Sequence, residues 1–165
     1  MTVGPPVDRQ EYGPRARPLP FERGTDGPRV VLVGVDGTRT SLRAAAYAAG
    51  LARRQGSALV VVFVSSPAPY TALADGVVAG AVQRTQDELA ADLRAECRQG
   101  AEELGLPVTF LCRRGDAYAE LRAAADETRA DLVVVGSSEQ AGHRFVGSVA
   151  TRLVRAGRWP VVVVP

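Results

Sequence analysis

Two glycines and a serine near the end of the chain are spaced so that they could hold an anion. An apolar run ends at Gly136, and Gly147 and Ser148 follow directly before a stretch with helical periodicity. Glycine lets the backbone approach a ligand closely, and the N–H groups that open a helix attract negative charge, so a phosphate group is the expected guest. Glu139 lies in the same loop and brings a negative charge of its own. The loop therefore predicts a phosphate site that one of its own residues opposes.

Other reactive residue types are few. Ser148, His143 and Asp36 are the right types for a nucleophilic arrangement, but the sequence contains no G-x-S-x-G motif, and a serine that opens a helix is usually a capping residue. His143 is the only histidine, which excludes a multi-histidine metal site. Cys97 and Cys112 lie far apart with no CxxC spacing, which favours reduced thiols. We expect no catalytic residue and no metal ligand.

Composition excludes several function classes. All 20 basic residues are arginine, so a Walker A loop, a kinase-type lysine and a pyridoxal Schiff base are impossible. The arginines are scattered and the net charge is only +2, which does not indicate a nucleic-acid partner. The N-terminus has no apolar leader, and the longest apolar run, residues 58–64, is too short to span a membrane. We expect a cytoplasmic protein without a membrane partner.

The residues that could bind an anion must be positioned by an alternating series of strands and helices. Five strands are predicted at residues 30–35, 58–64, 108–112, 132–135 and 161–164, and four helices at 41–55, 80–104, 117–128 and 147–156. This alternation predicts an α/β fold, a three-layer doubly wound five-stranded parallel sheet. Residues 1–28 contain six prolines and balanced charges, so we expect a flexible arm whose deletion leaves melting nearly unchanged, followed by one domain at 29–165.

In an open parallel sheet, ligands bind beyond the carboxyl ends of the strands, where the strand order reverses. If the first and fourth strands are neighbours, Asp36 faces the loop that begins at Gly136. Its carboxylate could accept hydrogen bonds from ribose hydroxyls or from an adenine amino group. Because Asp-Gly is a common turn pair, a purely local role for Asp36 is the alternative.

Residues 29–165 resemble the universal stress protein family. The resemblance is carried by VVLVGVDGT with the following Ser41, by VVVFV, by ADLVVVGSS and by GSVATRLVRAGRWPVVVVP. It implies an adenine nucleotide alpha hydrolase-like sheet with strand order 3-2-1-4-5 and a homodimer formed through Val161–Val164. The family divides into members that bind ATP and members that do not, so the resemblance leaves both readings open.

The resemblance to the ATP-binding branch implies a nucleotide site in the crevice between the first and fourth strands. ATP, with or without Mg²⁺, is the implied cofactor. The positions that match the family's glycine motif and adenosine contacts are Asp36, Val64, Gly136, Gly147 and Ser148.

The match departs from the family motif in the loop itself. Glu139 stands at the middle glycine position, and ten residues separate Gly136 from Gly147 where the motif has twelve. A like-charge pair at about 4 Å costs up to about 4 kcal/mol near a surface, whereas a helix N-terminus contributes about 0.3–1 kcal/mol. Gly142 could replace the missing glycine, and Arg144 could offer a phosphate a positive partner.

Two functions follow from this balance. The leading hypothesis is a stress-response regulatory or adaptor protein that binds an adenine nucleotide and is not an enzyme, apart from slow ATP hydrolysis at most. The alternative is a dimeric interaction scaffold whose degenerate pocket binds no nucleotide. Both leave the protein partner unknown, and the loop containing Glu139 discriminates between them.

Overall fold

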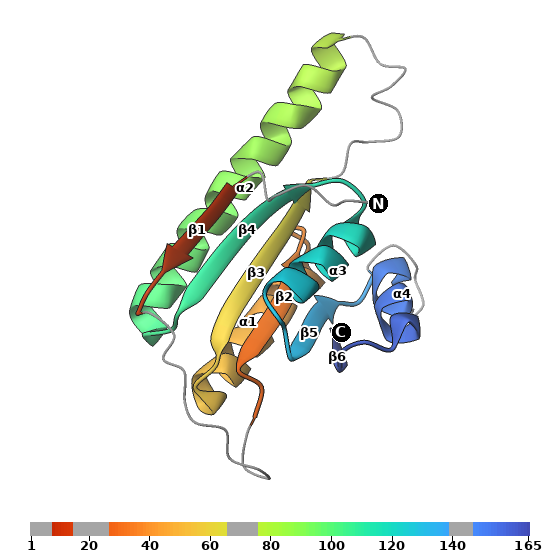
Figure 1. Cartoon of the computed structure of the whole chain (residues 1–165). Helices are drawn as coiled ribbons and strands as arrows, with labels where there is room; N and C mark the ends of the chain where they lie inside the picture. Colours follow the sequence, from red (N-terminus) through yellow and green to blue (C-terminus); the bar gives the residue numbers. More distant parts are fainter. Residues whose placement is uncertain (1–7, 15–26, 66–75, 139–146) are drawn as a thin grey trace.

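The chain forms one mostly parallel sheet with helices on both faces (Figure 1). The structure is a computed structural model that describes residues 8–14, 27–65, 76–138 and 147–165, without the side chains of 76–79. In chain order the elements are β1 (Asp8–Tyr12), β2 (Val30–Val35), α1 (Arg39–Gln55), β3 (Ala58–Ser65), α2 (Gly76–Leu104), β4 (Val108–Arg114), α3 (Ala117–Glu127), β5 (Leu132–Gly136), α4 (Ser148–Ala156) and β6 (Val161–Val164).

The sheet has the order β1-β4-β3-β2-β5-β6. Its five parallel strands are the predicted ones in the predicted order. The first and fourth predicted strands, β2 and β5, are neighbours, which is the condition for Asp36 to face the loop that begins at Gly136. The prediction of five strands is wrong, because β1 adds a sixth strand that pairs antiparallel with β4.

β1 comes from the N-terminal arm that was expected to lack regular structure. Its side chains alternate between partly buried and exposed, and Tyr12 packs against the core. Asp8 at the other end forms an ion pair with Arg94 of α2. The sequence did not predict this strand, because an edge strand needs only one covered face and so carries few apolar residues. The prolines and charges around it also favoured an irregular segment.

The core has two halves, one on each face of the sheet. α1 and α2 cover one face and α3 and α4 the other (Figure 1). Alternate residues of the central strands point to opposite sides, so Val31 and Val33 join the first half while Leu32 joins the second. Burial on both faces explains why these strands are continuous runs of valine and leucine.

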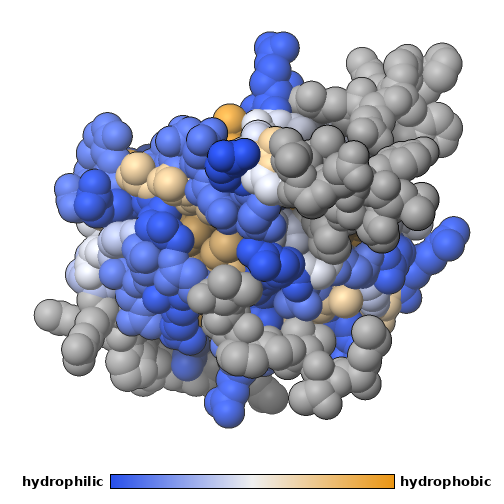
Figure 2. All heavy atoms as spheres, turned by 90° about the horizontal axis from the view of Figure 1, so that it is seen from above, coloured by the Kyte–Doolittle hydropathy of each residue, from blue (hydrophilic) through white to orange (hydrophobic). Residues whose placement is uncertain are grey.

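Most of the described residues visible from above the view of Figure 1 are hydrophilic, and hydrophobic ones show only in small areas (Figure 2). Within the described ranges, no helix combines the length and the apolar character that a membrane crossing needs.

Candidate functional site

A crevice of about 120 Å³ opens where β2, β3 and β5 end, beside the first turns of three helices. The described residues that line it are Gly34, Val35, Asp36, Thr38, Thr40, Ser41, Val62, Val64, Ala117, Leu121, Val135, Gly136, Ser137 and Val149. Three residues predicted from the sequence, Asp36, Val64 and Gly136, are therefore brought together at the ends of three separate strands.

Asp36 has a local structural role as well as a place in the crevice. Its Oδ1 accepts hydrogen bonds from the backbone N–H of Thr38 at 2.9 Å and from the Thr38 hydroxyl at 2.6 Å. Thr38 in turn caps α1 by accepting from the Ser41 N–H at 3.3 Å. The second carboxylate oxygen, Oδ2, takes part in none of these bonds and belongs to an exposed residue. The carboxylate thus organises the start of α1 and still has one oxygen for a ligand.

Gly136 is required by packing inside the protein. A Cβ at this position would lie 2.6 Å from the Thr40 carbonyl carbon and 2.7 Å from the Ser41 nitrogen. Next to it, the Thr40 hydroxyl donates to the Ser137 carbonyl at 2.7 Å. The end of β5 therefore meets the backbone of α1 directly, and this contact explains the glycine without a ligand.

Gly147 and Ser148 lie at the start of α4, adjacent to the lining residue Val149. Gly147 is the N-cap and has no side chain to accept from the first N–H groups of the helix. A Cβ on Gly147 would lie 3.1 Å from the Ser138 Cβ, so the two ends of the intervening loop are close together. A negatively charged group beside this helix start would be favoured by the exposed N–H dipoles.

The rest of the predicted loop, including Glu139, Gly142, His143 and Arg144, lies outside the described residues. Its contribution to the crevice therefore stays a prediction.

An arginine that sequence reasoning missed lies beside the crevice. Arg152 of α4 pairs with Asp116 at 3.3 Å, and its guanidinium lies 4.1 Å from the centre of the Tyr118 ring. Asp116 and Tyr118 flank the lining residue Ala117, so the guanidinium is held next to the crevice. Among the described lining residues none is basic. The available sequence signal was the spacing of Arg152, one helical turn after Ser148.

A buried ion cluster positions α3, the helix that contributes Ala117 and Leu121 to the crevice. Arg113 is 2% exposed and pairs with Glu120 at 3.5 Å and with Glu127. Arg113 lies in register with Val64 of the adjacent strand. The cluster thus holds α3 against β4, next to β3, whose Val62 and Val64 line the crevice.

Within the described part of the chain, no three His, Cys, Asp or Glu side chains are grouped so that they could hold a metal ion.

The fold and the crevice together define a doubly wound α/β protein with a small opening at the reversal point of its strand order. A family model described as the universal stress protein family matches residues 28–165. The chain therefore belongs to the universal stress protein family, as the sequence motifs indicated.

Individual relatives agree with this assignment. The chain is 25% identical to Universal stress protein MJ0531 of Methanocaldococcus jannaschii over 136 residues, which cover 81% of this chain and 80% of the relative. A crystal structure of a universal stress protein family member from Burkholderia pseudomallei is 26% identical, with a TM-score of 0.63 and coverage of 83% and 96%. A universal stress protein crystallised in complex with cAMP is also 26% identical, with a TM-score of 0.56 and coverage of 84% and 97%.

Proposed function

We propose that this protein is a cytoplasmic stress-response regulatory protein that binds an adenine nucleotide in the crevice between β2 and β5. The observation that carries the proposal is the convergence of Asp36, Val64 and Gly136 on one crevice beside a helix start with no capping side chain. The complex of a similar family member with cAMP supports an adenine compound as the ligand class.

The described crevice offers contacts to only part of a nucleoside. Its volume of about 120 Å³ is below the roughly 300–1,000 Å³ typical of pockets that enclose whole ligands. Apolar side chains such as Val64 and Leu121 offer surfaces for a flat base, and the Asp36 Oδ2 atom can accept from a ribose hydroxyl. The phosphates would then extend toward Gly147 and Ser148 at the start of α4.

Arg152 is the described cation that we assign to the phosphates. It is held beside the crevice by Asp116 and Tyr118, and a guanidinium can bind a phosphate in a bidentate manner. Its contacts with Asp116 and Tyr118 restrict the side chain before the ligand arrives, which reduces the entropy lost on binding. The ligand would compete with Asp116 for the guanidinium.

Titration calorimetry with ATP and Mg²⁺, ATP alone, AMP and adenosine tests the proposal. We expect saturable binding, with a loss of about tenfold or more in Asp36→Ala, while Asp36→Asn keeps the local bonds to Thr38 and separates folding from binding. Arg152→Ala should weaken ATP by about tenfold and adenosine hardly at all, with Arg155→Ala on the same helix as the control. A native protein that binds none of these compounds would refute the nucleotide site.

A second function, an interaction scaffold without nucleotide, is favoured by one observation. Gly136, the first glycine of the motif, is explained by its contact with α1. If the scaffold is the correct reading, Glu139→Gly should create an affinity for ATP that the native chain lacks.

We also propose that β6 forms the contact of a homodimer. The four valines of β6 are partly exposed at one end of the sheet, where strand pairing with a second copy would cover them. The Pro160 and Val164 carbonyls accept from the N–H groups of Val133 in β5 and of Ser137 just after it. The backbone groups of Val163 therefore point to the open edge.

Val163→Pro tests the dimer, because it removes an outward N–H without removing a bond to β5. Multi-angle light scattering should show a dimer for the native chain and for Val163→Thr, and a monomer for Val163→Pro. A native monomer throughout the micromolar range would contradict this proposal.

A further inference from the structure

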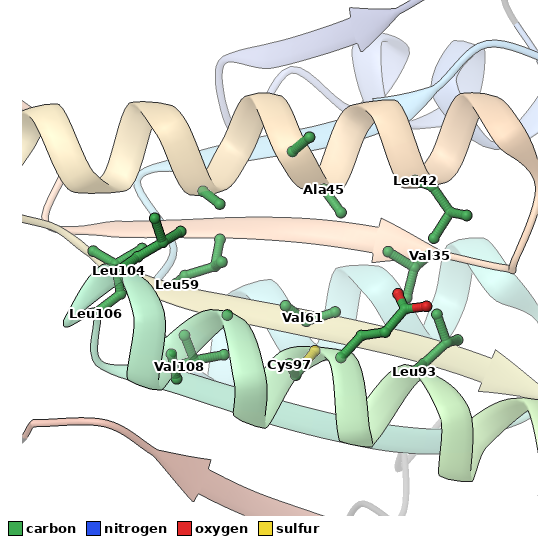
Figure 3. Close-up of a pocket in the computed structure, with 15 residues that line it drawn as sticks. Val35, Leu42, Ala45, Leu59, Val61, Leu93, Cys97, Leu104, Leu106 and Val108 are labelled. Carbon is green, nitrogen blue, oxygen red and sulfur yellow. The ribbon is translucent and has the colours of Figure 1, made fainter.

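A larger opening lies on the face of the sheet that α1 and α2 cover, opposite the face covered by α3 and α4. The space between α1 and α2 forms a groove of about 290 Å³ over the sheet, which we call the α1–α2 groove (Figure 3). Its floor is made by side chains of β2, β3 and β4, namely Val35, Leu59, Val61 and Val108.

The groove exists because the two helices present small residues to each other. Ala45 and Ala49 of α1 face the gap from one side, and Gly100 and Ala101 of α2 line the other. A Cβ added to Gly100 would meet no atom within 4 Å, so this part of the helix borders open space. Protein interiors are otherwise packed as densely as organic crystals, which makes an open apolar groove of this size unusual.

Large apolar side chains mark the two ends of the groove. Leu104 and Leu106 lie at one end, and Leu42 and Leu93 lie at the other (Figure 3). Leu42 is 39% exposed and Leu104 is 41% exposed. A guest that lay along the groove would cover both leucines and the apolar floor between them.

The charge of the groove determines which kind of guest it favours. Among the described residues that line it, Glu96 is the only charged one. Burial raises the pKa of the neighbouring Cys97 thiol to about 12, and the negative charge of Glu96 acts in the same direction. The thiol is therefore neutral at physiological pH, and the groove presents a single exposed carboxylate beside an apolar surface.

We propose that the α1–α2 groove binds an amphipathic amine, with the apolar body over the sheet and the ammonium group beside Glu96. The carboxylate attracts a cation and repels a fatty acid, while the apolar floor supplies most of the affinity. An engineered cavity of about 150 Å³ holds benzene, so by the same ratio the groove accommodates roughly twelve carbon atoms, as a chain or as two rings. Val35 is the one lining residue that this groove shares with the described nucleotide crevice.

Calorimetric titration with primary alkylamines from butylamine to decylamine tests the site in the full-length protein. We expect affinity to rise about fourfold for each added methylene group, which is the increment for moving that group out of water.

Gly100→Leu is the variant that blocks the groove. The new side chain enters open space, and leucine has a higher helix propensity than glycine, so α2 should fold at least as well. We expect octylamine affinity to fall by about tenfold or more, a loss comparable to that of two methylene contacts. Gly80→Leu makes the same exchange in the same helix, also in open space but away from the groove, and should leave binding unchanged.

Glu96→Arg tests the head group. The native chain should prefer octylamine to octanoate, and Glu96→Arg should reverse that preference, each by about two- to fivefold because the pair is exposed to solvent. Glu102→Arg, an equal charge change outside the groove lining, should not alter the preference.

Three results would overturn the proposal. One is the absence of amine binding at any chain length, and another is binding that Gly100→Leu leaves intact. The third is a change from dimer to monomer in Gly100→Leu, seen by sedimentation, which would mean that a second copy of the chain covers the groove.

Discussion

At the scale of single residues, several positions serve the fold and the crevice at once. Asp36 orders the start of α1 through Thr38 and still presents one carboxylate oxygen to the crevice. Gly136 lines the same crevice but is fixed by its contact with the α1 backbone. A glycine that matches a ligand motif can therefore be required by packing, and its substitution reports on both roles.

Gly136→Ala should lower the free energy of unfolding by about 1–3 kcal/mol in the absence of any nucleotide. The reason is the Cβ position at 2.6 Å from the Thr40 carbonyl carbon, which forces the end of β5 and the start of α1 apart. Urea denaturation of the ligand-free protein measures the change. Gly147→Ala, whose Cβ would meet only a side chain at 3.1 Å, is the control and should cost less. Equal stability of Gly136→Ala and the native protein would show that β5 and α1 can move apart at this contact without a measurable loss of free energy of unfolding.

Cys97 should make the protein lose stability in alkali. Burial raises the pKa of its thiol from 9.0 to about 12 in the folded state, so the neutral thiol is favoured by folding. The stabilisation is complete below pH 9 and is lost as pH rises from 9 toward 12, at up to about 1.4 kcal/mol per pH unit. Cys97→Ala should be less stable at pH 7 but should show a flatter decline between pH 9 and 10.5. Urea denaturation measures the free energy of unfolding at each pH. An equal decline in the two proteins would contradict the assignment of this pH dependence to the Cys97 thiol.

At the scale of elements, the position of α3 decides the shape of the crevice. The helix begins at the Asp116 cap, where the carboxylate accepts from the Ala119 N–H at 2.9 Å. Farther along, Glu120 and Glu127 hold the buried Arg113 of β4. The same helix therefore presents its start to the crevice and its polar side to an arginine within the sheet.

Arg113→Ala should destabilise the protein by about 3 kcal/mol, because it leaves the partly buried Glu120 without its cation. We place the loss at the lower end of the range for buried pairs, since the Glu127 side chain is 41% exposed. Thermal denaturation with Arg114→Ala, the exposed neighbour, as control should show a clear difference. A loss within about 0.5 kcal/mol of the control would mean that the cluster is incidental.

The elements that the sequence predicted are those with strong periodicity. The valine-rich strands and the alanine-containing helices were predicted within a few residues of their observed ends, because burial on two faces leaves a long apolar pattern. β1 was missed because the five residues DRQEY bury one face only. Arg152 was missed because its place beside the crevice depends on Asp116 and Tyr118 of another helix, which no local pattern records.

At the scale of the whole molecule, β1 closes one edge of the sheet. Without it, β4 would present an unpaired strand edge to solvent, and such edges favour association with other chains. β1 covers that edge with a strand of alternating polar residues. The opposite edge, β6, consists of four valines, so the two edges of the described sheet differ in polarity.

Deletion of residues 1–13 should lower the melting temperature by about 4–8 °C, the shift that corresponds to about 2 kcal/mol in a chain of this size. The deletion removes five paired residues, exposes the core surface under Tyr12 and leaves Arg94 without Asp8. This replaces the sequence-based expectation that the arm could be removed without effect. Calorimetry should show no comparable loss for deletion of residues 1–7, which keeps β1, and an unchanged melting temperature for both deletions would restore the first expectation.

The pairing of β1 with β4 also fixes an order of events during synthesis. Asp8 pairs with Cys112, so β1 waits during translation for a partner made more than one hundred residues later. At roughly 5–20 residues per second, that wait lasts about 5–20 s. The strands β2, β3 and β4, which pair in parallel with one another, have all been translated by the time β1 can pair. The polar composition of β1 keeps it in solution through this interval, and β1 completes its edge of the sheet late in folding.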